Sequence, residues 1–388
     1  MKHVLLPILL IIAAVARAAE VHPADNAAEM DSVEVSLLTC EPHDQIYSLY
    51  GHTALRYHDL RPGGLDVAFN YGVFNFNAPH FVVRFVFGRT DYELGAYPYR
   101  LFLGEYRHFG SQVTEQVLNL TADEKMQLRM LLAENLLPEN STYRYNYFYN
   151  NCTTKARDVV EQCINGRVEY TEREAPTETY RQAIHRMTAN NPWARFGNDL
   201  LLGIGADQPT TPRQQEFLPA TLMRHFDRAS IVSNGTSRPL VLQRRTAVEA
   251  GTQTIGDSFP LRPLWCGLIL LALDIVLAAV QKLRHSYFRW WDVALMTATA
   301  TLGTVLFLML FSSHPTVSLN LQLLLFNPLP WCCVWNVARG RPTRYWRLTL
   351  LLGAAFFAGS LFQHYAEGLW CLALCLLLQC CIHIKWKH

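Results

Sequence analysis

A cysteine stands where an aromatic, strand-like run ends and a helical pattern begins. The run covers residues 143–149, and Asn150-Asn151-Cys152-Thr153-Thr154 leads from it into a helical pattern that continues to Ile164. The start of a helix carries unpaired N–H groups and a partial positive charge, which lower the pKa of a cysteine and favour the nucleophilic thiolate. Cys152 is therefore predicted to be a nucleophile, although a buried packing thiol is the ordinary role of a free cysteine.

A thiol nucleophile needs a base, a polar group that orients the base, and N–H donors for an oxyanion. His52 lies in the strand-like segment 49–57, and Asn70 lies in the next segment, its expected hairpin partner. We assign Cys152 as nucleophile, His52 as base and Asn70 as orienting group, with the start of the helix supplying the donors. A structural histidine and a polar residue near a turn are the plain alternatives.

The rest of this region reads as a mixed α and β domain. A capping box at Thr121 and Glu124 opens a helix that should reach about residue 136. Helical patterns occur near 177–189, near 193–204 and after Pro219, and Asn234-Gly235 predicts a hairpin. We expect further strands at 33–39, 81–87, 92–97 and 112–120, and a linker at 243–259.

The two ends of the chain have the composition of export and membrane segments. Residues 1–18 have the charged start, apolar middle and A-x-A end of a signal peptide. Five apolar segments at 264–281, 292–311, 317–338, 346–362 and 369–384 predict membrane spans, the third broken by Pro328 and Pro330. Lysines and arginines occupy alternate loops, so the positive-inside rule places the domain before the first span outside the cytoplasm.

Several function classes are disfavoured by composition. The formal net charge of +2 argues against nucleic acid, and we find neither a phosphate-binding glycine loop nor clustered metal ligands, so no cofactor or metal is expected. Cys40, Cys152 and Cys163 are the cysteines of the exported domain, an odd number that leaves at least one thiol without an internal partner. Cys152 and Cys163 cannot pair on one helix because eleven residues separate them by roughly 16 Å.

The order of the chemical groups resembles a known class of thiol enzyme. In the circularly permuted papain-like (NlpC/P60-like) group, a Gly-His strand precedes an Asn-Cys helix start, as Gly51-His52 precedes Asn151-Cys152 here. That group includes phospholipid acyltransferases whose thiol takes up an acyl chain as a thioester. The resemblance implies an α+β, permuted papain-like exported domain, followed here by an all-α five-helix transmembrane bundle.

A second resemblance covers most of the chain. The segments at 50–56, 69–72, 146–154 and 217–219, with His314-Pro315 ahead of a hydrophobic bundle, are similar to the Lnb-type lipoprotein N-acyltransferase family of Bacteroides-like bacteria. This implies acylation of the α-amine of the diacylglyceryl-cysteine that begins a lipoprotein. It further implies a Cys152–His52 site, a phospholipid acyl donor, a lipoprotein acceptor, and a multi-pass inner-membrane protein with its catalytic domain in the periplasm.

We therefore expect three parts: a signal peptide at 1–18, a periplasmic catalytic domain at 19–262 and a five-span membrane domain at 263–388. Two other functions stay open, a membrane-anchored cysteine peptidase or amidase acting on peptidoglycan, and a non-catalytic envelope scaffold. The candidate contacts for lipid or substrate are Asn151, Tyr71, Arg84 and His314.

Overall fold

A computed structural model describes residues 29–43, 45, 48–74, 79–171, 178–252 and 259–385, so the predicted signal peptide lies outside the described residues. The chain forms two compact units. The sheet unit comprises the described parts of Met1–Phe81, Arg89–Thr177 and Thr210–Gly256. The helical unit comprises the described parts of Val82–Gly88, Glu178–Pro209 and Asp257–His388.

The sheet unit is built on a seven-stranded antiparallel sheet with the order β10-β5-β1-β2-β3-β4-β6. Its strands are β1 (Val33–Cys40), β2 (His52–Asp59), β3 (Asp66–Val73), β4 (Asp91–Pro98), β5 (Val113–Leu118), β6 (Thr142–Arg144) and β10 (Val241–Val248). A smaller sheet joins β7 (Arg167–Glu169), β8 (Ser230–Ser233) and β9 (Thr236–Pro239). The helices of this unit are α4 (Tyr99–His108), α5 (Ala122–Asn135), α6 (Cys152–Cys163), α9 (Pro212–Gln215) and α10 (Pro219–Arg228).

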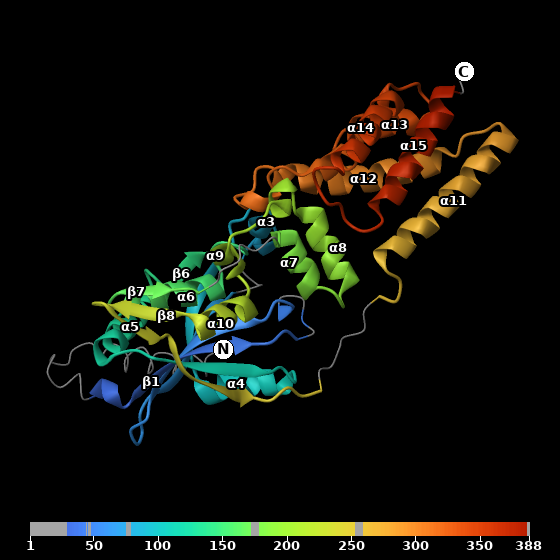
Figure 1. Ribbon diagram of the computed structural model, residues 1–388. Coiled ribbons are helices and arrows are strands. Elements are labelled where there is room, and N and C mark those ends of the chain that lie inside the picture. The colour runs from blue at the N-terminus through green and yellow to red at the C-terminus, as the bar shows by residue number, and fades with distance from the viewer. Residues whose placement is uncertain are drawn as a thin grey trace. The chain divides into compact units, whose positions relative to one another are not determined.

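Helices cover both faces of the large sheet, because successive strand residues point to opposite faces and both faces carry apolar side chains. Leu37, Leu55 and Phe69 pack against α5, α6 and α10 in the main core. Leu38 and Ala54, their neighbours along the strands, pack against α4 on the other face. The sheet is therefore the middle layer of three (Figure 1).

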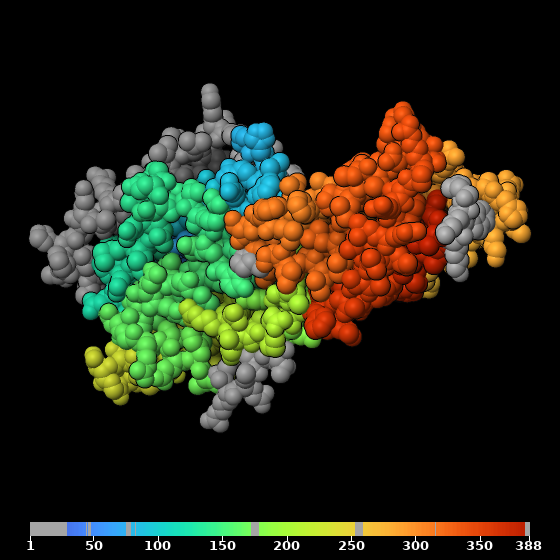
Figure 2. Space-filling view, turned by 90° about the horizontal axis from the view of Figure 1, so that it is seen from above, coloured from blue at the N-terminus to red at the C-terminus, as the bar shows by residue number. Residues whose placement is uncertain are grey.

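The helical unit contains the apolar C-terminal segments. Helices α11 (Pro263–Arg284) and α12 (Arg289–Met309) are long and apolar enough to cross a membrane. The shorter α13 (Pro330–Ala338), α14 (Tyr345–Gly359) and α15 (Leu369–Lys385) complete the helices of this region. Figure 2 shows their orange and red side chains meeting in one packed body. The unit also holds α7 (Tyr180–Met187), α8 (Pro192–Leu201), η3 (Ile204–Asp207), η4 (Pro315–Val317), η5 (Leu321–Leu324) and, apart from its first residue, α3 (Phe81–Val86).

Buried amide side chains join the parts of the helical unit that are distant in sequence. Asn320 donates a 2.7 Å hydrogen bond to the carbonyl of Leu200, and Gln322 donates one of the same length to the carbonyl of Asp199. Gln363 donates to the oxygen of Asn320 at 2.9 Å. These bonds fasten α8, which precedes the apolar segments by many residues, to the loops between the C-terminal helices.

Most predicted elements are confirmed, including the capping box at Thr121 and the hairpin, where Asn234 and Gly235 adopt positive φ. Two predictions are wrong. The segment 81–87 is predicted as a strand, but Phe81–Val86 forms helix α3, since Phe85 packs against His314 and tertiary contacts override a weak strand preference. Residues 243–248, predicted as linker, belong to β10, which pairs with β5 and extends the sheet.

The C-terminal region is apolar and helical, as predicted. Of its described helices, α11 and α12 are long enough to cross a membrane, and α14 and α15 are shorter apolar helices. The third segment is broken, as the prolines predict: η4 and η5 precede α13, which begins only at Pro330. All ten cysteines, including Cys40 and Cys163, have free thiols.

Candidate active site

The first turn of α6 is organised by the side chain of Asn151. Its Oδ1 accepts hydrogen bonds from the backbone N–H groups of Thr153 and Thr154, both at 2.9 Å, as an N-cap. The Thr154 hydroxyl accepts from the N–H of Asn151 at 2.9 Å, which completes a capping box. The Asn151 amide donates to the carbonyl of Phe217 at 2.9 Å. Cys152, the first residue of the helix, is thereby held at a fixed end of α6.

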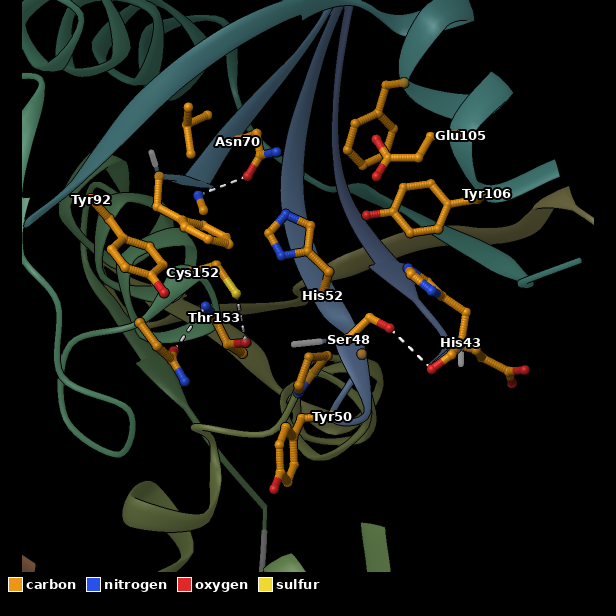
Figure 3. A pocket seen from close by; sticks show the side chains of 18 of the residues that line it. His43, Ser48, Tyr50, His52, Asn70, Tyr92, Glu105, Tyr106, Cys152 and Thr153 are labelled. Atoms are coloured by element: carbon orange, nitrogen blue, oxygen red, sulfur yellow. Dashed lines mark hydrogen bonds between the residues drawn. The ribbon is translucent and has the colours of Figure 1, made fainter. Parts of the chain in front are cut away.

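The strand β2 brings His52 to this helix start. Gly51, with a φ of +77°, turns the chain into the strand, and an added Cβ there would lie 2.6 Å from the carbonyl oxygen of Cys40. Thr53 points to the opposite face from His52, and its hydroxyl lies 3.1 Å from the Thr153 hydroxyl. This contact ties β2 to α6, and the imidazole of His52 lies beside the sulfur of Cys152 (Figure 3).

Asn70 and Gly72 on β3 complete the surroundings of the imidazole. One ring nitrogen of His52 faces Cys152 and the other faces Asn70 (Figure 3). Asn70 Oδ1 accepts a 2.7 Å hydrogen bond from the N–H of Gly72, which fixes the amide. A Cβ on Gly72 would lie 2.8 Å from Cε1 of His52 and 3.0 Å from Asn70 Oδ1. The ring can occupy this place only because residue 72 has no side chain.

The electrostatics of the pair favour charge separation. Burial raises the pKa of the Cys152 thiol, but the His52 charge and hydrogen-bonding groups of His52, Thr53 and Thr153 lower it, to about 7 overall. Burial lowers the pKa of His52, but the Cys152 charge and the polar Asn70 side chain leave it above its ordinary value. Near neutral pH a substantial fraction of the pair is therefore thiolate and imidazolium.

The pair lines a cavity of about 490 Å³ in the sheet unit. Helix α4, which is not among the predicted elements, contributes one wall, and Leu101 on it is 68% exposed. His43 is buried, stacks on Phe109 with ring centroids 4.1 Å apart, and lines the cavity. Aromatic side chains make up much of the lining: Phe102 and Tyr106 on α4, and Tyr50, Phe74, Tyr92, Tyr97, Tyr145, Tyr147 and Phe217 on the other walls. Two carboxylates, Glu41 and Glu105, also line the cavity.

The cap changes which groups can hold an oxyanion. Since Asn151 occupies the N–H groups of Thr153 and Thr154, the helix start offers fewer donors than predicted. Within the described part of the chain, the backbone N–H of Cys152 has no acceptor. The hydroxyl of Tyr92 points toward Cys152 (Figure 3), and burial, then the Cys152 charge, raises the pKa of Tyr92 to about 12, so it remains a donor at neutral pH.

A buried ion cluster supports the segment that carries Phe217. Glu216 accepts a 3.0 Å bond from the guanidinium of Arg157 on α6 and lies 2.8 Å from Nδ1 of His225 on α10. All three side chains are at least nine-tenths buried. Removing one partner from such a cluster would leave an uncompensated buried charge. The contact between Arg157 and Glu216 therefore favours the observed position of Glu216 beside α6.

The four residues predicted to contact lipid or substrate do not gather in one place. The side chain of Asn151 is occupied by backbone groups, as described above. Tyr71 lies in the main core, where its hydroxyl accepts from Asn135 at 2.9 Å, and it is not among the described residues that line the cavity. Arg84 and His314 belong to the helical unit. No group of three or more metal-binding side chains occurs among the described residues.

Fold and site together define a membrane protein whose separate α+β domain carries a Cys–His pair. Residues 20–186 match the Lnb N-terminal periplasmic domain, and residues 254–388 match the Lnb transmembrane domain. The chain belongs to the Lnb family, which relates it to lipoprotein maturation, and it is a membrane protein with a periplasmic domain. No curated protein and no solved structure is significantly similar to it.

Proposed function

We propose that the protein is a lipoprotein N-acyltransferase of the inner membrane. It moves an acyl chain from a membrane phospholipid to the α-amine of the N-terminal diacylglyceryl-cysteine of a lipoprotein. The observation that carries this proposal is the Cys152–His52 pair, with a thiol pKa of about 7, in an aromatic-walled cavity of about 490 Å³. Apolar walls suit an acyl chain better than a hydrated glycan, and a membrane domain gives access to both lipid substrates.

In the first half-reaction the Cys152 thiolate attacks the carbonyl carbon of a phospholipid ester. The N–H of Cys152 and the hydroxyl of Tyr92 donate to the oxyanion of the tetrahedral intermediate. The C–O bond then breaks, the His52 imidazolium gives its proton to the departing alkoxide, and a lysophospholipid leaves. The product is an acyl thioester on Cys152 and a neutral His52.

In the second half-reaction the neutral α-amine of the lipoprotein attacks the thioester carbonyl. His52 accepts the proton of the amine, and the C–S bond breaks to release the amide. Thiolate and imidazolium are restored, so no further reactant is needed. Asn70 keeps the imidazole oriented through both steps, and Asn151 acts as a positioning residue that fixes the start of α6.

The test uses the full-length protein in membranes with a diacylglyceryl lipoprotein, and mass spectrometry of the lipoprotein N-terminal peptide. Cys152→Ala should abolish the mass increase of one acyl chain, and the wild-type enzyme should carry an acyl group on the Cys152 peptide. Cys163→Ala, at the other end of the same helix, is the matched control and should still acylate. Unchanged acylation by Cys152→Ala would refute the proposal, as would Cys152-dependent cleavage of muropeptides without acyl transfer.

A further inference from the structure

A second cavity, of about 610 Å³, lies within the helical unit. It is lined by the first turn of α12, the loop from Gly340 to Arg344, the first turn of α14 and the end of α15. It sits at the Arg289 end of α12, whereas the opposite end of α12 leads to the loop that carries His314. The arginine-rich end is the one that the positive-inside rule places in the cytoplasm. The proposed acyl transfer makes no use of this cavity.

The cavity is strongly basic. Four arginines line it, and none has a carboxylate within ion-pair distance among the residues that the structure describes: Arg289, Arg341, Arg344 and Arg347. The one described carboxylate in the lining is Asp292, which is 1% exposed and whose Oδ2 lies 2.9 Å from Nε2 of His383. An excess of unpaired guanidinium groups around one hollow attracts an anion, for which their planar donors suit a phosphate.

Two helix N-termini add to this positive field. Helix α12 begins at Arg289 and has no side-chain cap on its first N–H groups. Helix α14 begins at Tyr345, whose N–H donates to the Thr343 hydroxyl at 3.1 Å, and its N-cap residue Arg344 makes no side-chain cap bond to the N–H groups that follow. Both helices are long enough, at 21 and 15 residues, to present an aligned dipole at the cavity. Uncapped N–H groups at the positive end of a helix are a common way to bind phosphate.

The lining also contains a stacked histidine and one carboxylate oxygen without a hydrogen-bond partner among the described residues. The imidazole of His383 is sandwiched between Tyr287 and Trp346, with ring centroids 4.7 and 4.1 Å away and planes within 11° and 4°. Asp292 Oδ1 is buried and has no hydrogen-bond partner among the described residues. A buried acceptor of this kind requires a donor, since leaving it unpaired is costly. A hydroxyl group of the bound molecule would supply that donor.

We propose that this cavity binds the headgroup of an anionic, hydroxyl-bearing phospholipid of the cytoplasmic leaflet, such as phosphatidylglycerol. The arginines and the two helix N-termini hold the phosphate, and Asp292 accepts a hydrogen bond from a headgroup hydroxyl. The acyl chains remain alongside the apolar helices. The site is a lipid-binding site remote in sequence from Cys152, and it takes no part in the acyl-transfer chemistry.

The test places the purified full-length protein in nanodiscs of phosphatidylcholine with increasing phosphatidylglycerol, and counts retained lipids by native mass spectrometry. The wild-type protein should retain phosphatidylglycerol in preference to phosphatidylcholine. Arg344→Gln/Arg347→Gln should weaken this retention by about fivefold for each arginine removed. Arg344→Lys/Arg347→Lys keeps both positive charges and should retain most of the bound phosphatidylglycerol. That result would show that the loss in the glutamine variant is not caused by misfolding.

Arg284→Gln is the matched control, because Arg284 ends α11 near the same membrane surface but does not line the cavity. It should bind phosphatidylglycerol as the wild-type protein does. Equal retention of the two lipids by the wild-type protein would overturn the proposal, as would unchanged retention by Arg344→Gln/Arg347→Gln. Inorganic phosphate is the second probe: millimolar phosphate that displaces the lipid completely would identify a site for free phosphate instead.

Discussion

Replacing His52 with Gln should remove the positive charge that sustains the Cys152 thiolate while keeping most of the side-chain volume. The pKa of the thiol is about 7 in the folded protein against an ordinary 9.0, although burial alone would raise it. Without the imidazolium the pKa should return to 9 or above. At pH 7 the thiolate fraction then falls from about one half to about 1%, so reaction with an alkylating agent should slow by roughly fiftyfold.

The assay follows iodoacetamide modification of the Cys152 peptide by mass spectrometry between pH 5 and 10. The wild-type rate should rise with pH through a midpoint near 7, because the thiolate forms as pH passes the lowered pKa. Cys163 is an internal control, since it is 0% exposed and burial raises the pKa of its thiol to about 12. His58→Ala, on the same strand, should leave the midpoint unchanged. If His52→Gln also left it unchanged, the assignment of His52 as the activating group would be wrong.

Three further predictions concern the neighbours of the pair. Gly72→Ala should lower acyl transfer by roughly ten- to a hundredfold by displacing His52, because the new Cβ would lie 2.8 Å from Cε1 of the ring. Gly104→Ala is the control, because a Cβ added there would meet no neighbouring atom within 4 Å. Equal activity of the two variants would contradict this geometry. Asn151→Ala removes the cap of α6 and its bond to the Phe217 carbonyl, and should lower the free energy of unfolding by about 1–2 kcal/mol, measured by denaturant titration. Tyr92→Phe should lower kcat by roughly a hundredfold with little change in KM if its hydroxyl stabilises the oxyanion, whereas a rise in KM alone would assign it to substrate binding.

The elements closest to Cys152 could be predicted because their signals are local. The position of Cys152 at a helix start follows from the helical pattern that begins after Asn150-Asn151, and the structure starts α6 at Cys152 with Asn151 as its N-cap. The pairing of the strands that carry His52 and Asn70 follows from their alternation and the turn between them. Gly72 was present in the same strand, but its need to be glycine depends on the position of the His52 ring.

Other parts of the site depend on contacts between distant segments. Helix α4 carries a cavity wall, yet its ten residues contain aromatic side chains that suit strands and helices alike. His43 lines the cavity because it stacks on Phe109, a residue far from it in the sequence. The donors available to an oxyanion also differ from those predicted, because Asn151 Oδ1 accepts hydrogen bonds from two N–H groups that the helix start would otherwise offer.

The sequence by itself determined the order of the chemical groups, the helix start at Cys152 and the apolar C-terminal segments, because caps, periodicity and hydropathy act over a few residues. Only the tertiary structure decided that β10 extends the sheet, that α8 packs with the C-terminal helices, and that Tyr92 points to the thiol. The tertiary structure also decides the pKa of the Cys152 thiol, because that pKa depends on the charge of His52, which folding brings beside Cys152 from a hundred residues away.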